Sequence, residues 1–264
     1  MIDEYLTNLI IFFTGIASGF FISIASGTAG ALILPCLTII ASVSIYQAIG
    51  SSLLIDAIIG ITAGIIFYKK GFVELKPILI IGSIGIIFAL IGSQFTSSTP
   101  EFYLTIILGI FLFVLGINFT INGVYKNLDY INSKVSFEFF RKNQTIFFVV
   151  AGIIAGFLSG FFGMGSSGLI AIILILFFGF KIRVGVGTSL FMMFFIAGSG
   201  GIGHAINNEF ILEPLIFGGI GAFIGAIFGS ILSYKTDEDK LSRAIGVIVT
   251  IFGLVFIIKS FYPV

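Results

Sequence analysis

The sequence predicts an all-α polytopic membrane protein built from two inverted-topology repeats. Of its 264 residues, 58% are hydrophobic and only 9% are charged, and the mean hydropathy is +1.22. Soluble domains carry about 25% charged residues, so a soluble fold is excluded. About twenty apolar residues cross a bilayer, and such runs lie near 48–67, 76–96, 102–121, 186–205, 212–233 and 242–259.

Two further apolar stretches, 6–43 and 146–178, are interrupted by small and polar residues at 23–30 and 163–168. Each is expected to form two short helices with a break between them. At about 1.5 Å per residue the second stretch would extend about 50 Å, less than the roughly 60 Å of two full crossings. We therefore expect hairpins that cross the bilayer fully or partly, giving eight to ten membrane segments.

Landmarks of the first half recur in the second half at a spacing of 137 residues, as from Pro77 to Pro214. In the same register GSSL at 50–53 falls on GTSL at 187–190. Chance matches are easy among 34 glycines, but the prolines and the Ser-Leu pairs share one register. The predicted organisation is a membrane repeat at 1–121, a cytoplasmic link at 122–145 and a second membrane repeat at 146–264.

Charges in the short loops indicate that the repeat is inverted. Cytoplasmic loops collect Lys and Arg, so the basic loop 69–76 is expected inside, whereas its acidic counterpart 209–213 is expected outside. The turn at 43–47 is uncharged, but its counterpart at 180–183 is basic. Opposite preferences of equivalent loops predict inverted topology. Both termini then lie outside, and the two hairpin tips approach each other near the membrane centre.

The hairpin tips are the predicted binding site for a small anion. Helix N-termini offer N–H groups and a positive dipole end, glycines allow close approach, and hydroxyls donate without a charge. The alternative is that small residues only allow close helix packing, and that the 50–53 and 187–190 segments are ordinary helix caps. The predicted substrate-binding residues are Ser23, Ser26, Gly27, Thr28, Gly30, Ser51, Ser52, Ser159, Gly163, Gly165, Ser166, Ser167, Thr188 and Ser189.

Asp56 is the sole acidic residue well inside a predicted span, and no Lys or Arg lies in the spans to pair with it. A carboxylate at that depth is costly, so it is neutralised, paired or functional. We expect a proton carrier, because desolvation penalises its charged form. The alternative is a protonated or hydrogen-bonded structural residue. Its counterpart in the repeat is Met193, so its role is asymmetric.

Several other functions are excluded or disfavoured. A net charge of +1 points to no nucleic-acid partner. Cys36 is the only cysteine and His204 the only histidine, so no disulfide within the chain, metal site or cofactor is expected. His204 is expected at the external end of a span, either as a proton-coupling residue or as a solvated span end. Enzyme motifs such as HExxH are absent, so no catalytic residue is predicted.

Two motifs carry a family resemblance: GFLSGFFGMG at 156–165, then VGTSL at 186–190 followed by His204. In this order they resemble the TauE/SafE sulfite-exporter family, also called the toluene-sulfonate uptake permease family. The resemblance covers nearly the whole chain, although the first tip has SGTAG at 26–30 where the family has a richer glycine run. It implies transport of small sulfur-containing or organic anions, such as sulfite or sulfonates, across the plasma membrane.

The expected function is therefore secondary transport, with a neutral anion site between the tips and coupling to protons through Asp56. One alternative is a transporter of another solute, including a cation bound at Asp56. Another is a membrane interaction protein without transport of its own. The sequence leaves open the anion, the direction of transport, the coupling ion and whether the chain works as a monomer or a homo-oligomer.

Overall fold

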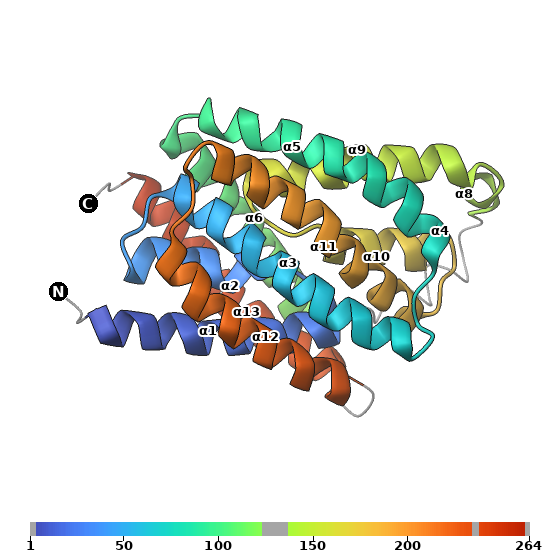
Figure 1. Cartoon of the computed structure of the whole chain (residues 1–264), viewed down its shortest axis with the longest axis horizontal. Helices are drawn as coiled ribbons and strands as arrows, with labels where there is room; N and C mark the ends of the chain where they lie inside the picture. The colour runs from blue at the N-terminus through green and yellow to red at the C-terminus, as the bar shows by residue number, and fades with distance from the viewer. Residues whose placement is uncertain (1–3, 123–136, 234–237, 262–264) are drawn as a thin grey trace.

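The computed structural model describes residues 4–122, 137–233 and 238–261, in which every regular element is a helix (Figure 1). The first half contains α1 (Glu4–Ala25), α2 (Gly30–Pro35), the π-helix η1 (Cys36–Ile40), α3 (Ile45–Lys69), α4 (Leu75–Pro77), the π-helix η2 (Ile78–Gly82), α5 (Ser83–Ser97) and α6 (Glu101–Asn122). The second half contains α8 (Glu138–Lys142), α9 (Gln144–Phe162), α10 (Ser167–Leu176), α11 (Ile182–Ile206), α12 (Leu212–Leu232) and α13 (Glu238–Phe261).

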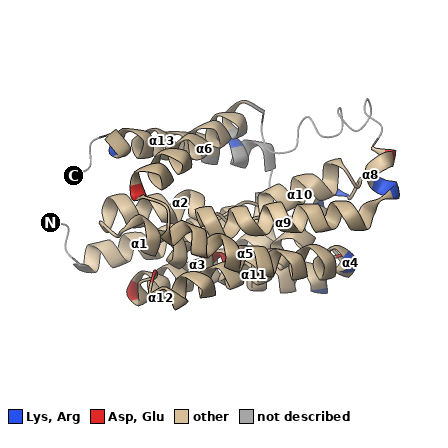
Figure 2. Ribbon diagram, turned by 90° about the horizontal axis from the view of Figure 1, so that it is seen from above, with Lys and Arg blue, Asp and Glu red and all other residues tan. Residues whose placement is uncertain are grey.

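Seven helical segments of the described residues are long and apolar enough to span a membrane. They are Tyr5–Ile24, Ile45–Lys69, Leu75–Ser97, Glu101–Asn118, Gln144–Phe162, Ile182–Ile206 and Leu212–Leu232. Three shorter apolar helices accompany them, at Gly30–Ile40, Ser167–Leu176 and Gly246–Phe261. Charged residues gather at the ends of the helices (Figure 2). The prediction of a multi-pass helical membrane protein is confirmed.

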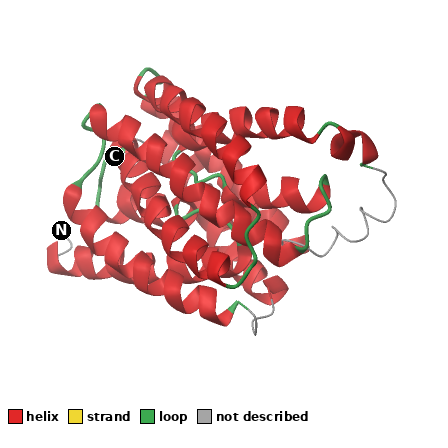
Figure 3. Cartoon of the chain, turned by 45° about the vertical axis from the view of Figure 1, so that its right-hand side comes forward, coloured by secondary structure: helices red, strands yellow, loops and turns green. Residues whose placement is uncertain are grey.

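Both broken stretches contain the expected break, but their arms are unequal. The first arms, α1 with 22 residues and α9 with 19, are long enough to span, and only the second arms are short. The expectation of two short helices in each stretch is therefore wrong for α1 and α9. The physical reason is that each break falls late, at Ser26 and Gly163, whose φ angles of 54° and 69° are left-handed and end a right-handed helix. Figure 3 shows loops in the interior of the helical bundle as well as at its ends.

The long helices pack mainly against partners from the other half of the chain. α1 lies along α12, α9 lies along α5, and α3 lies against α11. Glycines make these contacts close: the backbone beside Gly15 of α1 approaches Gly218 of α12, and Gly156 of α9 approaches Gly85 of α5, so that a Cβ would clash with the facing backbone. Small residues allow such close approach in lipid. The alternative reading of the glycines as packing residues thus holds at these positions.

The helices α6 and α13 form a separate layer over the other helices (Figure 2). Gly116 and Gly253 bring the two backbones together, since a Cβ on either would clash with the facing helix. Contacts from this pair to the rest of the molecule are sparse. One of them is a hydrogen bond of 2.8 Å from Lys259 Nζ to the carbonyl oxygen of Thr38 in η1. The pair therefore covers the hairpin tips as a two-helix unit.

Most of the basic link predicted at 122–145, namely residues 123–136, lies outside the described residues. The described part of the link is α8, which lies at the end of the molecule opposite to the start of α1 and the end of α13 (Figure 1).

Candidate functional site

The two hairpin tips contact each other directly in the interior of the molecule. The hydroxyl oxygen Oγ1 of Thr28, in the first tip, accepts a hydrogen bond of 2.7 Å from the backbone N–H of Gly165 in the second. The hydroxyl of Ser167 donates to the carbonyl oxygen of Gly27. These bonds join two segments that are far apart in the sequence, and the expected approach of the two tips is therefore found.

Asp56 of α3 lies against both tips and is fully buried. Its Oδ1 accepts a bond of 2.6 Å from the N–H of Ala29. Its Oδ2 accepts bonds of 2.8 Å from the Thr28 hydroxyl and 3.0 Å from the N–H of Gly165. We expected the N–H groups of the tips to be unpaired and available to a substrate anion. Those of Ala29 and Gly165 are instead occupied by a carboxylate of the chain itself, because a buried carboxylate needs donors.

A cavity of about 250 Å³ lies between the tips and the α6–α13 pair. It is large enough for several water molecules or a small ligand. Six predicted site residues line it: Ser26, Gly27, Thr28, Ser159, Gly165 and Ser166. The sequence did not indicate the apolar remainder of the wall: Phe21, Ile22, Ala31, Leu32, Phe111, Leu115, Ala155, Leu158, Phe162, Met164, Gly168, Leu169, Ile172 and Val249.

Two hydroxyls of the cavity wall lack a hydrogen-bond partner among the described residues. They belong to Ser159 and Ser166, whose side chains are buried. Buried polar groups in folded proteins are nearly always satisfied by protein, water or ligand. Among the described residues, no Lys, Arg, Asp, Glu or His lines this cavity. The described wall is therefore mostly apolar, and the hydroxyls of Ser159 and Ser166 lie buried within it.

The predicted hydroxyls of Ser51 and Thr188 lie elsewhere and hold loops. Ser51 Oγ accepts a bond of 3.1 Å from the N–H of Ile211, and Thr188 Oγ1 accepts one of 3.0 Å from the N–H of Glu74. These residues do not line the cavity. Each hydroxyl ties the first part of its own helix to a loop of the other half.

Ser52 and Ser189 support the tips from the neighbouring helices α3 and α11. Ser52 Oγ donates to the carbonyl oxygen of Gly163 at 2.9 Å, and Ser189 Oγ lies 3.0 Å from Ser26 Oγ. Each serine therefore contacts the tip of the opposite half, at the residue with the left-handed φ.

The remaining predicted residues serve packing in this structure. A Cβ on Gly30 would lie 2.6 Å from the carbonyl oxygen of Gly163, so the two tips meet there by backbone contact. The hydroxyl of Ser23 is buried without a partner among the described residues, but it does not line the cavity.

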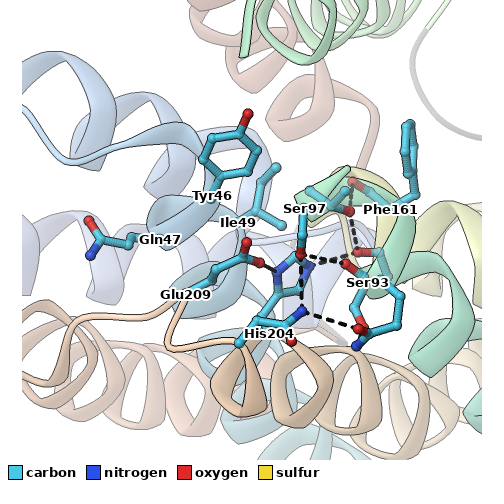
Figure 4. Close-up of polar contacts among 12 residues, drawn as sticks. Tyr46, Gln47, Ile49, Ser93, Ser97, Phe161, His204 and Glu209 are labelled. Atoms are coloured by element: carbon cyan, nitrogen blue, oxygen red, sulfur yellow. Dashed lines mark hydrogen bonds and ion pairs between the residues drawn. The ribbon is translucent and has the colours of Figure 1, made fainter. Parts of the chain in front are cut away.

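His204 is fully buried near the end of α11 and does not form a solvated span end (Figure 4). Its Nδ1 lies 2.7 Å from Glu209 Oε2, and its Nε2 lies 2.9 Å from the carbonyl oxygen of Gly160 in α9. Both ring nitrogens of this buried side chain therefore have a hydrogen-bonding partner. His204 does not line the cavity, and it ties α9 to α11 and to the following loop.

Comparisons with known proteins agree with this architecture. A model of the family described as "Sulfite exporter TauE/SafE" matches residues 11–256. The chain is 29% identical to "Probable membrane transporter protein YdhB" of Bacillus subtilis, over 85% of this chain and 89% of YdhB. It is 22% identical to "Probable membrane transporter protein YunE" of the same organism, over 94% of this chain and 96% of YunE. No solved structure matches the chain significantly.

Proposed function

This chain belongs to the sulfite exporter TauE/SafE family of membrane transporters, and we propose that it moves small sulfur-containing or organic anions across the plasma membrane, coupled to protons through Asp56. The observation that carries this proposal is the cavity at the joined hairpin tips, with unpartnered hydroxyls in its wall. We assign substrate binding to Ser159, Ser166 and Thr28, which line it.

The donors around the cavity favour an anion over a cation. Metal cations such as Na⁺ or Ca²⁺ need several oxygen ligands with free lone pairs. At Asp56, N–H and O–H donors already approach both carboxylate oxygens. No basic side chain of the described residues lines the cavity, which also suits a transporter, because an anion held only by neutral donors is released easily.

The contacts between the halves support the inverted repeat. The bond from Ile211 to Ser51 and the bond from Glu74 to Thr188 are equivalent in the 137-residue register. The packing of α1 on α12 is likewise equivalent to that of α9 on α5. In such transporters one repeat moves against the other around a central site. We propose alternating access by this motion.

The orientation is also a proposal. The start of α1 and the end of α13 lie at one end of the molecule, whereas α4 and α8, with basic residues, lie at the other (Figures 1 and 2). Basic residues favour the cytoplasmic side, so we place both termini outside.

Uptake into proteoliposomes tests the proposal. Labelled sulfite and methanesulfonate are offered under an imposed pH gradient to the native protein and to the Ser159→Ala/Ser166→Ala double variant. Ser18→Ala is the matched control, because its hydroxyl is also buried and unpartnered among the described residues but lies outside the cavity. We expect native flux, at least tenfold weaker apparent affinity in the double variant and an unchanged control. Absence of flux for both anions in well-folded native protein would reject the assignment.

A further inference from the structure

Two residues, Thr28 and Gly165, separate Asp56 from the cavity. Thr28 and Gly165 line the cavity, whereas Asp56 does not. Both donate to the same carboxylate oxygen, Oδ2, at 2.8 and 3.0 Å. The carboxylate thus lies directly behind the cavity surface and holds two of the surface's donors.

The hydrogen bonds of Thr28 are saturated in this state. Its hydroxyl proton points to Asp56, while its oxygen accepts bonds of 2.7 Å from Gly165 N–H and 3.1 Å from Gly30 N–H. A hydroxyl has one proton and two acceptor lone pairs, so nothing remains for a ligand. The N–H of Gly165 is likewise shared between Thr28 and Asp56. An anion in the cavity finds both donors taken.

We propose that Asp56 and the transported anion compete for these two donors, so that the cavity binds its anion tightly only when Asp56 carries a proton. This inference rests on the proposed function and specifies its coupling. A proton added at Oδ2 makes that oxygen a donor to Thr28 Oγ1, where it takes the lone pair that now accepts from the N–H of Gly165. The Thr28 hydroxyl proton then turns to the cavity, and the N–H of Gly165, which has lost both of its acceptors, is free to donate to the anion. The negative charge of Asp56 is thus neutralised as the negatively charged anion enters the cavity.

No other ionisable group in direct contact takes part in this exchange. The described groups that bind Asp56 come from the first tip, Thr28 and Ala29, and from the second tip, Gly165. From α11 the neighbour is Met193, whose sulfur lies near both Gly165 and Asp56. Among the described residues no Lys, Arg, His or other acid is in this set, so the coupling is expected to follow one proton per anion.

The test uses methanesulfonate, whose charge does not change between pH 5 and 9, and the full chain in nanodiscs. Calorimetry gives its Kd across this range. In buffers of different ionisation enthalpy it also gives the number of protons taken up on binding. For the native protein we expect Kd to rise up to tenfold per pH unit once Asp56 is ionised, with nearly one proton taken up per anion. Below that point we expect a flat Kd and no proton uptake.

Variants separate coupling from a structural role. Asp56→Asn is expected to bind with a Kd independent of pH and to exchange anions without accumulating them under a pH gradient. Thr28→Val should weaken binding at least tenfold at low pH, and Thr28→Ser should restore it. Thr62→Val is the control, because its hydroxyl only donates to Ile58 of its own helix.

A pH-independent Kd in the native protein, with no proton uptake on binding, would overturn the inference even if flux is present. The same conclusion follows if Asp56→Asn keeps the native pH profile. Absence of methanesulfonate binding and of all anion flux at every pH would instead reject the proposed function, so the two failures are distinguishable.

Discussion

The two hairpin tips share a backbone conformation but differ in chemistry. Ser26 and Gly163 are equivalent in the 137-residue register and are both left-handed, with φ of 54° and 69°. Two residues later the first tip has Thr28 and the second has Gly165. Two neighbouring helices contribute the equivalent residues Asp56, from α3, and Met193, from α11, beside Thr28 and Gly165. The backbone break is therefore needed twice, whereas the ionisable group and its hydroxyl partner occur once. The proposed coupling group therefore belongs to only one of the two proposed repeats.

The largest expected change in stability comes from a buried histidine that only the second tip has beside it. His204 binds Gly160, three residues before Gly163, and its counterpart in the first half is Phe67. We expect His204→Phe to lower the free energy of unfolding by about 3 kcal/mol, because it removes the hydrogen-bonding partner of both the buried Gly160 carbonyl and the Glu209 carboxylate. Thermal unfolding in detergent measures this. His204→Phe/Glu209→Gln should recover part of the loss, and full additivity of the two changes would contradict a paired role.

Gly163→Ala tests whether the second tip tolerates a side chain at the left-handed position, as the first tip does with Ser26. Its Cβ would lie 2.7 Å from Ile49 Cγ2 and 2.9 Å from Ile49 Cα. We expect a loss of about 2–3 kcal/mol, from the backbone conformation and the clash together. Gly71→Ala, with φ of 75° and open space around it, isolates the conformational part at about 1 kcal/mol. Equal losses in chemical unfolding would show that the Ile49 contact does not matter.

Gly165→Ala sharpens the comparison at the position equivalent to Thr28. The new Cβ would meet Asp56 Oδ2 at 2.6 Å and Met193 Sδ at 2.9 Å. We expect about 1–2 kcal/mol lower stability and at least tenfold lower anion flux. Gly198→Ala is the control, because its Cβ would make only an ordinary contact of 3.6 Å with Ala57 and Gly198 does not line the cavity. Similar flux in the two variants, measured in proteoliposomes, would remove Gly165 from the site.

The smallest effects are expected where the two halves are most alike. Ser51→Ala and Thr188→Val each remove one acceptor from a loop N–H. Each substitution should lower the free energy of unfolding by about 0.5–1.5 kcal/mol. The two losses should be similar if the halves are equivalent. A difference above about 1 kcal/mol between the two losses, measured by thermal unfolding, would show that the two halves also differ outside the tips.

Hydropathy and small-residue clusters were sufficient to predict both breaks and the long helices outside the two broken stretches. The 137-residue register also relates Thr28 to Gly165, and these two residues are in contact in the structure. The unequal hairpin arms were missed because Ser23 and its neighbours, although small and polar, continue α1 to Ala25. Composition does not predict at which residue the backbone adopts the left-handed conformation that ends a helix.

Other features of the site leave no mark in a single sequence. Phe111 and Leu115 of α6 line the cavity. Residue type alone does not distinguish an apolar residue that faces a cavity from one that faces lipid. The burial of His204 depends on Glu209 and on Gly160, which lies far away in the chain. The partners of Asp56 likewise come from two distant tips. Such contacts follow from tertiary packing, which hydrophobic periodicity alone does not specify.

The pairing of each long helix with one from the other half has a consequence for biosynthesis. α1 ends at Ala25, but its partner α12 begins at Leu212. At ribosomal rates of about 5–20 residues per second, α1 waits roughly ten to forty seconds for that partner. During this time its glycine face, around Gly15, has only lipid or the insertion machinery against it. Neither half can complete its contacts alone, so the first half should mature only when the second is supplied, in the same chain or from a second gene.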